Sequence, residues 1–286
     1  MSAPLGVVGG SGLYSMAGLQ GAEEIRVATP FGDPSDAYIR GTIGGRPIVF
    51  LARHGRGHRL LPTELNFRAN IAGFKMLGCE RLVSVSAVGS MKEDLHPLDV
   101  VLPDQFIDWT RHRTGTFFGG GVVAHVSFAD PVCAELRGLL RRSAEGTPVR
   151  LHDGGTYLCV EGPQFSTRAE SRLYRSWQVD VIGMTNAQEA KLAREAEICY
   201  ATMAMVTDFD CWKEDEPAVT VEEVVARLHD NAKNAEAIVT RALGLLPEKR
   251  SCPCGSALAN AVLTDRARIP AEARQRLRPI AGARLD

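Results

Sequence analysis

The chain has 286 residues, of which 45% are hydrophobic and 23% charged, and its formal net charge is −1. Such a composition is typical of a globular protein of one large or two small domains, and it gives no general attraction to nucleic acid or an anionic membrane. We expect no cleaved leader and no membrane span, because the N-terminal region lacks an apolar core and no stretch nears the roughly 18 apolar residues of a span. The seven cysteines are odd in number and scattered, which favours a reducing cytoplasm.

The first predicted strand, residues 5–8, runs into a glycine-rich turn that contains Ser11. Such a turn can present backbone N–H groups and a hydroxyl to an anion. A dinucleotide-binding fingerprint is disfavoured, because its third glycine would fall where Ser15 stands and no acidic residue ends a second strand at the expected offset. An anion-binding turn and an ordinary tight turn are the two remaining interpretations.

Two antiparallel strands are predicted at residues 37–43 and 47–52, and the second leads into a basic segment, residues 53–58. Arg53 offers a planar fork of donors, His54 adds another donor, and the glycines permit close backbone approach. This pattern predicts a phosphate site, with a solvated basic loop as the alternative. His58 and Arg59 are expected at its periphery.

A helix is predicted at residues 65–77, followed by a buried strand at 82–86 whose end carries small residues and hydroxyls. Ser86 could donate to an anion there, although a serine in a turn more often serves its own backbone. Further along, the pattern predicts a strand, a glycine-rich loop that is mobile or faces a partner, a helix, a strand and a helix, at residues 99–102, 111–130, 131–145, 155–160 and 167–177.

Residues 181–212 form the centre of the chain's organisation. A short strand breaks at Gly183, a helix with an alanine-rich face spans 186–197, and a nearly continuous apolar strand spans 198–207 before Asp208-Phe209-Asp210. In open α/β sheets, ligands bind outside the carboxyl ends of parallel strands. We therefore expect residues 183–185 and the two aspartates to converge on one pocket.

The C-terminal part begins with a long predicted helix at 221–243, with a capping box at 220–223 and Gly244 just past its end. Cys252-Pro253-Cys254 follows. This spacing is too tight for a four-ligand zinc site without two further ligands; a peripheral pair of thiols is the preferred interpretation, with a strained disulfide or pairing with another chain as alternatives. Because strands alternate with helices, we predict one α/β domain over residues 1–245 and a helical extension over 246–286.

Two features require a joint explanation. The early loops and the segment after Gly183 supply an anion site that would hold phosphate or a phosphate ester, made of Ser11, Arg53, His54, Ser86 and Thr185. Desolvation raises the pKa of a carboxyl group, so Asp208 and Asp210 could donate to a purine ring nitrogen as well as accept from its exocyclic amine. Two aspartates at this spacing could equally be metal ligands or belong to a solvated turn.

The sequence resembles the trimeric purine nucleoside phosphorylases, and among them those that act on 5′-methylthioadenosine. The resemblance covers most of residues 5–245 in the same order, through GVVGGSGLY, LARHGRGH, SAVGS, EGPQFSTRAES, MTNAQEAKLAREAEICYA and TDFDCWKE. It implies a single α/β domain around a mixed, partly barrel-like sheet flanked by helices, assembled as a homotrimer or a dimer of trimers in the cytoplasm.

The implied reaction is the phosphorolysis of S-methyl-5′-thioadenosine to adenine and 5-methylthio-α-D-ribose 1-phosphate. Phosphate would be the co-substrate, with no metal and no organic cofactor. The alternatives are phosphorolysis of purine nucleosides or methylthioinosine, a hydrolytic nucleosidase and a nucleoside sensor; an NAD-dependent oxidoreductase is disfavoured by the failed glycine fingerprint.

The resemblance also assigns site residues. Asp208 and His54 would be catalytic, and the phosphate would be held by Ser11, Arg53, His54, Ser86 and Thr185 with the backbone of Ala87 nearby. The nucleoside would be contacted by Met184 at the ribose, Phe165 at the base, Asp208 and Asp210 at N7 and the 6-amino group, Val224 at the methylthio group, and His125 from a neighbouring subunit. Gly183 stands where relatives carry an asparagine next to the ribose, so one side-chain contact of those relatives is missing here.

Overall fold

A mixed β-sheet forms the centre of the computed structural model, which describes residues 2–13, 16, 18–213 and 221–285, with side chains in the last segment given from Arg227 onward. The strands in this part of the chain are β1 (Leu5–Gly9), β2 (Gln20–Ile25), β3 (Tyr38–Ile43), β4 (Arg46–Ala52), β5 (Arg81–Ser90), β6 (Val100–Leu102), β7 (Gln105–Trp109), β8 (Leu151–Asp153), β9 (Thr156–Val160), β10 (Val181–Gly183) and β11 (Cys199–Asp208). The helices are α1 (Phe67–Met76), α2 (Ala134–Ala144), α3 (Arg168–Ser176), α4 (Asn186–Glu195), α5 (Val221–Leu245) and α6 (Ala271–Ala281).

Strand β5 is the branch point of the sheet. One path runs β2-β3-β4-β1-β5-β10-β9-β7, and a second path leaves β5 through β11 to β6 and β8. β1 and β11 both run parallel to β5, whereas β10 runs antiparallel to it. Side chains of the two paths meet in one buried cluster, which includes Val88, Val101, Tyr157, Val181 and Val206. This enclosure of a core by strands of one branched sheet confirms the predicted mixed, partly barrel-like architecture.

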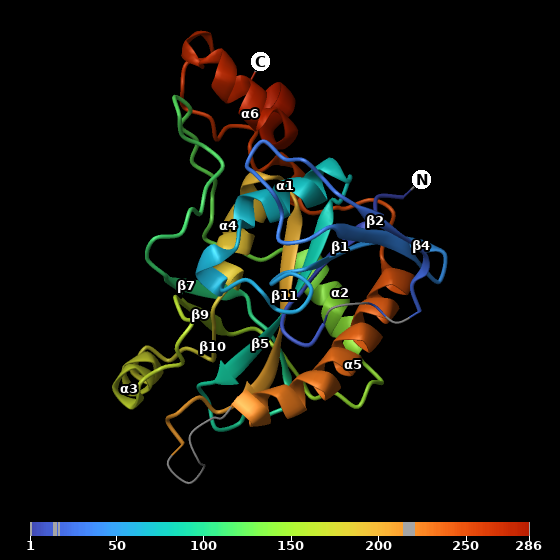
Figure 1. Ribbon diagram of the computed structural model, residues 1–286, viewed down its shortest axis with the longest axis vertical. Helices are drawn as coiled ribbons and strands as arrows, with labels where there is room; N and C mark the ends of the chain where they lie inside the picture. The colour runs from blue at the N-terminus through green and yellow to red at the C-terminus, as the bar shows by residue number, and fades with distance from the viewer. Residues whose placement is uncertain (1, 14–15, 17, 214–220, 286) are drawn as a thin grey trace.

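Helices cover the sheet on both faces (Figure 1). α2 and α5 pack over one face, where their leucine, isoleucine and valine side chains share a cluster with Leu5 and Val7. α1 and α4 pack over the other face, where their side chains share a cluster with Val8. Successive strand residues point to opposite faces, so the adjacent pair Val7 and Val8 contributes to both cores. The predicted alanine-rich face of α4 is confirmed, since Ala187, Ala190, Ala193 and Ala196 are all buried.

Most predicted elements are confirmed within a few residues, but two boundaries were wrong. β5 continues to Ser90, because Gly89 and Ser90 pair with β10 and residues as far as Gly89 pair with β11. α5 continues through Gly244 to Leu245. There the Arg46 side chain donates to the carbonyl oxygens of Leu243 and Leu246, so the helix end has its cap without a glycine. Strands β2, β7 and β8 were not predicted, and the capping box at 220–223 lies partly outside the described residues.

The C-terminal segment and the 111–130 loop lie side by side at one end of the long axis, with α6 outermost (Figure 1). The His125 amide donates to Ala261 O at 2.9 Å, and the Leu263 amide donates to Val123 O at 2.9 Å. Leu277 and Ile280 of α6 pack in the same cluster as residues of α1 and α4. None of the helices in the described part of the chain is long and apolar enough to cross a membrane.

Candidate active site

The site lies where two strands stop short of each other along one edge of β5. β1 ends with Gly9 opposite Val85, and β10 approaches from the other direction with Ile182 opposite Gly89. Within the described residues, no strand pairs with residues 86–88 on this edge. The expected convergence of residues 183–185 and the aspartates is confirmed, but its stated reason was wrong. The prediction assumed that β10 and β11 end side by side as parallel strands. β10 runs antiparallel to β5, so residues 183–185 lead from β10 toward the C-terminal end of β1.

A cavity of about 520 Å³ opens at this interruption. Ten residues expected at the site line it: Ser11, Arg53, His54, Ser86, Ala87, Phe165, Met184, Thr185, Asp208 and Asp210. β5 runs along the cavity from one end to the other. Ser86 marks one end. Gly89 marks the other, because a Cβ on Gly89 would lie 3.1 Å from Asp208 Oδ1. Three residues of strand separate the two ends by about 10 Å. The cavity is therefore of a size to hold a pentose with one group on either side.

Arg53 is fixed at the basic end by a buried ion pair. Its Nε donates to Glu189 Oε1 at 2.5 Å, Nη2 donates to Ser84 Oγ and Glu189 Oε2, and Nη1 donates to Val85 O at 3.0 Å. Arginine has five N–H donors, so the second Nη1 hydrogen remains for the cavity. Burial lowers the pKa of Arg53, and the Glu189 carboxylate more than offsets this, leaving the pKa above its ordinary value. The guanidinium is a permanent, immobile positive charge.

Glu189 is the main residue that sequence reasoning missed. It is 2% exposed and lies on α4, and its Oε2 also accepts from Ser84 Oγ at 2.8 Å and Tyr200 Oη at 3.0 Å. These hydrogen bonds hold the Nε and Nη2 side of the Arg53 guanidinium, so the charged group keeps its position at the cavity. An acidic residue among the buried alanines of α4 was the available signal, because a buried carboxylate needs a partner.

His54 differs from its expected role as a donor. Its Nδ1 lies 2.8 Å from Leu60 O, which assigns the proton to Nδ1 and leaves Nε2 as an acceptor. Burial and the neighbouring Arg53 charge lower the pKa of His54 to about 4, so the ring is neutral at pH 7. A neutral ring can accept a proton or a hydrogen bond from a protonated phosphate oxygen.

His58 and Arg59 were expected at the periphery, which was wrong, because both line the cavity. The His58 ring stacks on His54 with centroids 4.5 Å apart and an interplanar angle of 18°. Burial also lowers the pKa of His58. Arg59 donates to Ser35 O at 2.6 Å. A tight turn after β4 places His58 and Arg59 next to His54, because the amides of Arg59 and Leu60 both donate to His54 O.

The backbone of Ala87 faces the interruption, as strand alternation requires. Val85 O accepts from the Gly10 amide of the β1 end, and the Met91 amide donates to Asp180 O just before β10. Residues 85 and 91 therefore direct their backbone groups to this edge. Every second residue of a strand faces the same edge, so Ala87, which lies between them, also directs its N–H and C=O there. Gly10 must be glycine here, because a Cβ would lie 2.6 Å from Arg53 Nη1 and 2.8 Å from Val85 O. Thr185 adds the N-terminus of α4, whose dipole favours an anion.

The carboxyl pair occupies the other end. Burial raises the pKa of Asp208, against hydrogen bonds from the Thr207 hydroxyl at 2.6 Å and the Asp210 amide at 2.8 Å. Burial also raises the pKa of Asp210, whose Oδ2 accepts from Ser171 Oγ at 2.5 Å. Asp210 has a left-handed φ of 52°, a conformation that aspartate tolerates better than most residues. Both groups therefore hold a proton to a higher pH than an exposed carboxyl group does.

The middle of the cavity is lined by Met184 and by the backbone of Gly183. A Cβ at Gly183 would lie 1.9 Å from Tyr157 Oη, so the tyrosine fills the space that a side chain there would need. Tyr157 Oη lies 3.4 Å from Ser86 Oγ, which links it to the anion end. Phe165 lies at the mouth and is 55% exposed.

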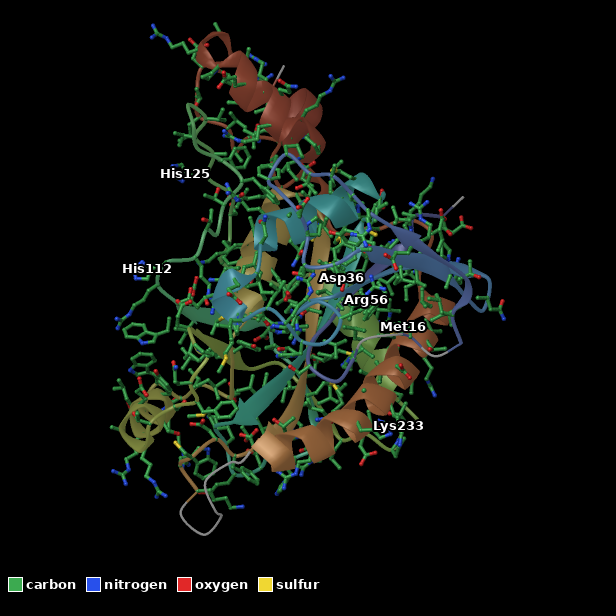
Figure 2. The ribbon with its side chains drawn as sticks, in the orientation of Figure 1. Met16, Asp36, Arg56, His112, His125 and Lys233 are labelled. Atoms are coloured by element: carbon green, nitrogen blue, oxygen red, sulfur yellow. The ribbon has the colours of Figure 1, made fainter. Side chains whose placement is uncertain are left out.

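Among the described residues that were expected at the site, His125 does not line this cavity. His125 lies on the loop beside the C-terminal segment (Figure 2), as its amide bond to Ala261 requires. Its assignment concerned a neighbouring subunit and stays a prediction. The Val224 side chain lies outside the described residues; Leu228, one turn further along α5, lines the cavity.

Comparison with known proteins agrees with this geometry. Residues 4–244 match the model of the phosphorylase superfamily. An S-methyl-5′-thioadenosine phosphorylase from Koribacter versatilis is 60% identical over 99% of this chain and 97% of its own length, and one from Geobacter sulfurreducens is 56% identical over 99% of each.

Two solved structures have the same fold. A methylthioadenosine phosphorylase sourced from an antarctic soil metagenomic library superposes with a TM-score of 0.91 at 48% identity, covering 98% of this chain and 99% of that one. The methylthioadenosine phosphorylase of Schistosoma mansoni in complex with adenine superposes with a TM-score of 0.82 at 34% identity, covering 89% and 96%. The chain therefore belongs to the phosphorylase superfamily and, within it, to the family of S-methyl-5′-thioadenosine phosphorylases.

Proposed function

We propose that this chain catalyses the phosphorolysis of S-methyl-5′-thioadenosine to adenine and 5-methylthio-α-D-ribose 1-phosphate. The observation that carries the proposal is a single cavity with a fixed guanidinium at one end and buried carboxyls of raised pKa at the other. The relatives' shared activity and the adenine bound to the Schistosoma enzyme support the same assignment.

In the proposed mechanism, a phosphate oxygen attacks C1′ of the ribose. The new C1′–O bond forms as the C1′–N9 bond breaks, and the electron pair of the broken bond goes to the purine. Asp208, protonated at the start, gives its proton or a strong hydrogen bond to N7 and so stabilises the departing base. Asp210 accepts from the 6-amino group. The pKa of Asp208, which burial raises, favours its role as proton donor.

The anion end would position the nucleophile beside the positively charged sugar of the transition state. The free Nη1 hydrogen of Arg53, the hydroxyls of Ser11, Ser86 and Thr185, and the Ala87 amide are the proposed donors. His54 Nε2 would accept from the phosphate O–H, which keeps the dianion oriented. The reaction so written needs no organic cofactor and no metal.

One assay separates the candidate functions. The protein is incubated with methylthioadenosine with and without inorganic phosphate, and adenine and the sugar phosphate are quantified. We expect adenine only when phosphate is present, in equal amount to the sugar phosphate. Adenine release without phosphate would instead indicate a hydrolase, and binding without release a sensor. Adenosine, inosine and methylthioinosine, run in parallel, test whether the enzyme is a broader purine nucleoside or methylthioinosine phosphorylase.

Assembly as a homotrimer or a dimer of trimers in the cytoplasm completes the proposal. Large apolar side chains are exposed near the cavity mouth and on the neighbouring β7 and α3, namely Leu61, Trp109, Phe165 and Leu173. A partner that covers them would also bring a second chain to the open side of the cavity, where His125 of that chain is proposed to reach the 5′ substituent. Light scattering of the purified protein gives the mass of the assembly, and a monomer would contradict this part.

A further inference from the structure

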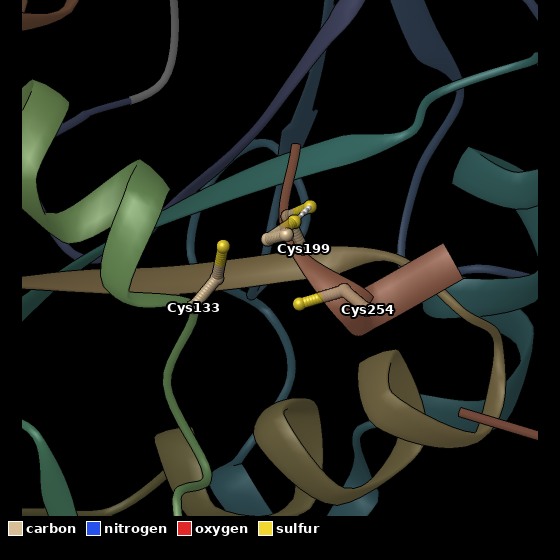
Figure 3. A group of neighbouring side chains, drawn as sticks. Cys133, Cys199 and Cys254 are labelled. Atoms are coloured by element: carbon tan, nitrogen blue, oxygen red, sulfur yellow. Dashed lines mark hydrogen bonds between the residues drawn. The ribbon is translucent and has the colours of Figure 1, made fainter. Parts of the chain in front are cut away.

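Four cysteine side chains gather at a point far from the cavity. The sulfur atoms of Cys133, Cys199, Cys252 and Cys254 all lie within 4.8 Å of one another (Figure 3). The closest recorded pair is Cys199 and Cys252, with sulfurs 3.2 Å apart. Three of the four are buried and Cys252 is half-buried. The Cys-x-Cys pair of the tail, which alone is too tight for a metal site, thus meets two further thiols.

Three separate parts of the fold bring these cysteines together. Cys133 is the N-cap of α2, and its amide donates to Tyr200 O at 2.9 Å. Cys199 begins β11, and its amide donates to Glu80 O at 2.9 Å. The segment after α5 that carries Cys252 and Cys254, called the tail here, is held by Glu135 of α2. Glu135 Oε2 accepts from the amides of Ser251 and Cys252. Backbone hydrogen bonds therefore fix the positions of three of the four cysteines independently of any bond between sulfurs.

The spacing suits one four-coordinate metal ion. A tetrahedral Zn²⁺ site has Zn–S distances of about 2.3 Å, which places its sulfurs roughly 3.8 Å apart. The recorded separations, from 3.2 Å to at most 4.8 Å, bracket this value. Small rotations of the side chains are enough to reach the tetrahedron. Four sulfur ligands in this geometry favour zinc over magnesium, calcium or manganese, which prefer oxygen.

Positive charge lies close to the sulfur atoms. The Leu136 amide donates to Cys133 Sγ at 3.5 Å, at the positive end of α2. The Arg250 side chain lies against the Cys199 sulfur. A cation and a helix N-terminus thus offset part of the negative charge that four thiolates and one Zn²⁺ would leave.

We propose that Cys133, Cys199, Cys252 and Cys254 bind one structural Zn²⁺ ion. Each sulfur forms one Zn–S bond, the thiol protons pass to solvent, and no group is oxidised or reduced. The ion ties the C-terminal tail to the start of β11 and to the N-terminus of α2. β11 places Cys199 and Asp208 nine residues apart, or about 30 Å, so the ion takes no part in phosphorolysis.

Metal analysis of the full-length protein tests the proposal. The protein is purified under reducing conditions without chelator, loaded with ZnSO₄ and desalted, and its zinc is measured by mass spectrometry. We expect about one zinc per chain, consistent with a four-sulfur site. Cys252→Ser and Cys254→Ser should each lose most of it, whereas Cys79→Ser, a buried cysteine outside the cluster, should retain it.

A spectroscopic titration keeps the test independent of whether a variant folds. Apo wild-type protein titrated with CoCl₂ should develop thiolate-to-cobalt charge-transfer bands and the strong visible bands of tetrahedral Co²⁺, saturating at about one equivalent. Added Zn²⁺ should bleach them and raise the apparent Tm. Absence of these bands with no zinc retained would overturn the proposal. So would equal zinc in the wild type and both tail variants, or disulfides among these four cysteines in the reduced, zinc-loaded protein.

Discussion

The two ends of the cavity are built on opposite principles. At the end where we propose that phosphate binds (the phosphate end), Arg53 and Glu189 are 1% and 3% exposed in their side chains, and their charges are already paired without a ligand. At the end where we propose that the purine binds (the purine end), Asp208 and Asp210 accept from hydroxyl and amide donors, and burial raises the pKa of each. One end holds a constant charge in a fixed place, and the other is prepared to change its protonation. This division fits a reaction in which the nucleophile must be positioned and the leaving group must receive a proton.

The purine end is broken most directly by Asp208→Asn, because an amide cannot give up a proton. We expect kcat for methylthioadenosine to fall by about 10²- to 10⁴-fold, the usual range for losing a general acid. Thermal unfolding should change little, since the amide oxygen still accepts from the Asp210 amide. The Thr207 bond reverses, with the new NH₂ group donating to the Thr207 hydroxyl, which can itself donate to Val88 O. Asp210→Asn is the matched control, with a smaller loss and a shift toward 6-oxopurine substrates. Wild-type turnover in Asp208→Asn would exclude the proposed proton donor.

The phosphate end is broken by Glu189→Ala, which leaves the Arg53 charge buried without its partner. Removing one member of a buried pair costs about 3–5 kcal/mol, so the free energy of unfolding should drop by this order. Urea titration measures it. Glu24→Ala, which removes an exposed partner of Arg56, serves as the control and should leave the urea midpoint unchanged. If the two variants unfolded at the same urea concentration, the network behind Arg53 would not be what fixes it.

Because His54 at the phosphate end is neutral in the folded protein, the stability of the fold should depend on pH. Its pKa is held at about 4, below the ordinary 6.5, by burial and by Arg53. Between these values the unfolded chain binds a proton that the folded chain does not, so stability is lost as the pH falls from 6.5 toward 4, by up to about 3 kcal/mol. His54→Gln should flatten this dependence in denaturant titrations, whereas His112→Gln on the exposed loop should keep it. An unchanged slope in His54→Gln would mean that other groups cause it.

The smallest effect is expected from Ser86→Ala, which removes one neutral donor from the phosphate end. KM for phosphate should rise roughly tenfold, the worth of one hydrogen bond, while adenine inhibits as before. Steady-state kinetics at varied phosphate measures this, with Ser176→Ala on the exposed face of α3 as the control. A rise in KM for the nucleoside alone would place Ser86 at the sugar instead.

Much of the candidate site could be predicted from local patterns in the sequence. The glycines and basic residues after β4, the small residues along β5 and the two aspartates at the end of β11 all lie in or next to the strand that positions them, so their convergence could be predicted. The Arg53–Glu189 pair could not, because 136 residues separate the partners and neither has a local signature of the other. The direction of β10 was also missed, since only tertiary pairing with Gly89 and Ser90 determines it. The four-sulfur cluster joins three distant segments for the same reason.

The interruption along β5 leaves a place where bound ligands could complete the sheet. The Ala87 amide and carbonyl point to an edge where neither β1 nor β10 reaches. The carbonyl accepts from Ser86 Oγ at 3.4 Å, and water is the natural partner of the amide in the free protein. Phosphate and sugar would take the place of the absent backbone and close the ladder. Hydrogen exchange at this amide should then slow when substrates bind, which makes one backbone proton a reporter of occupancy for the whole cavity.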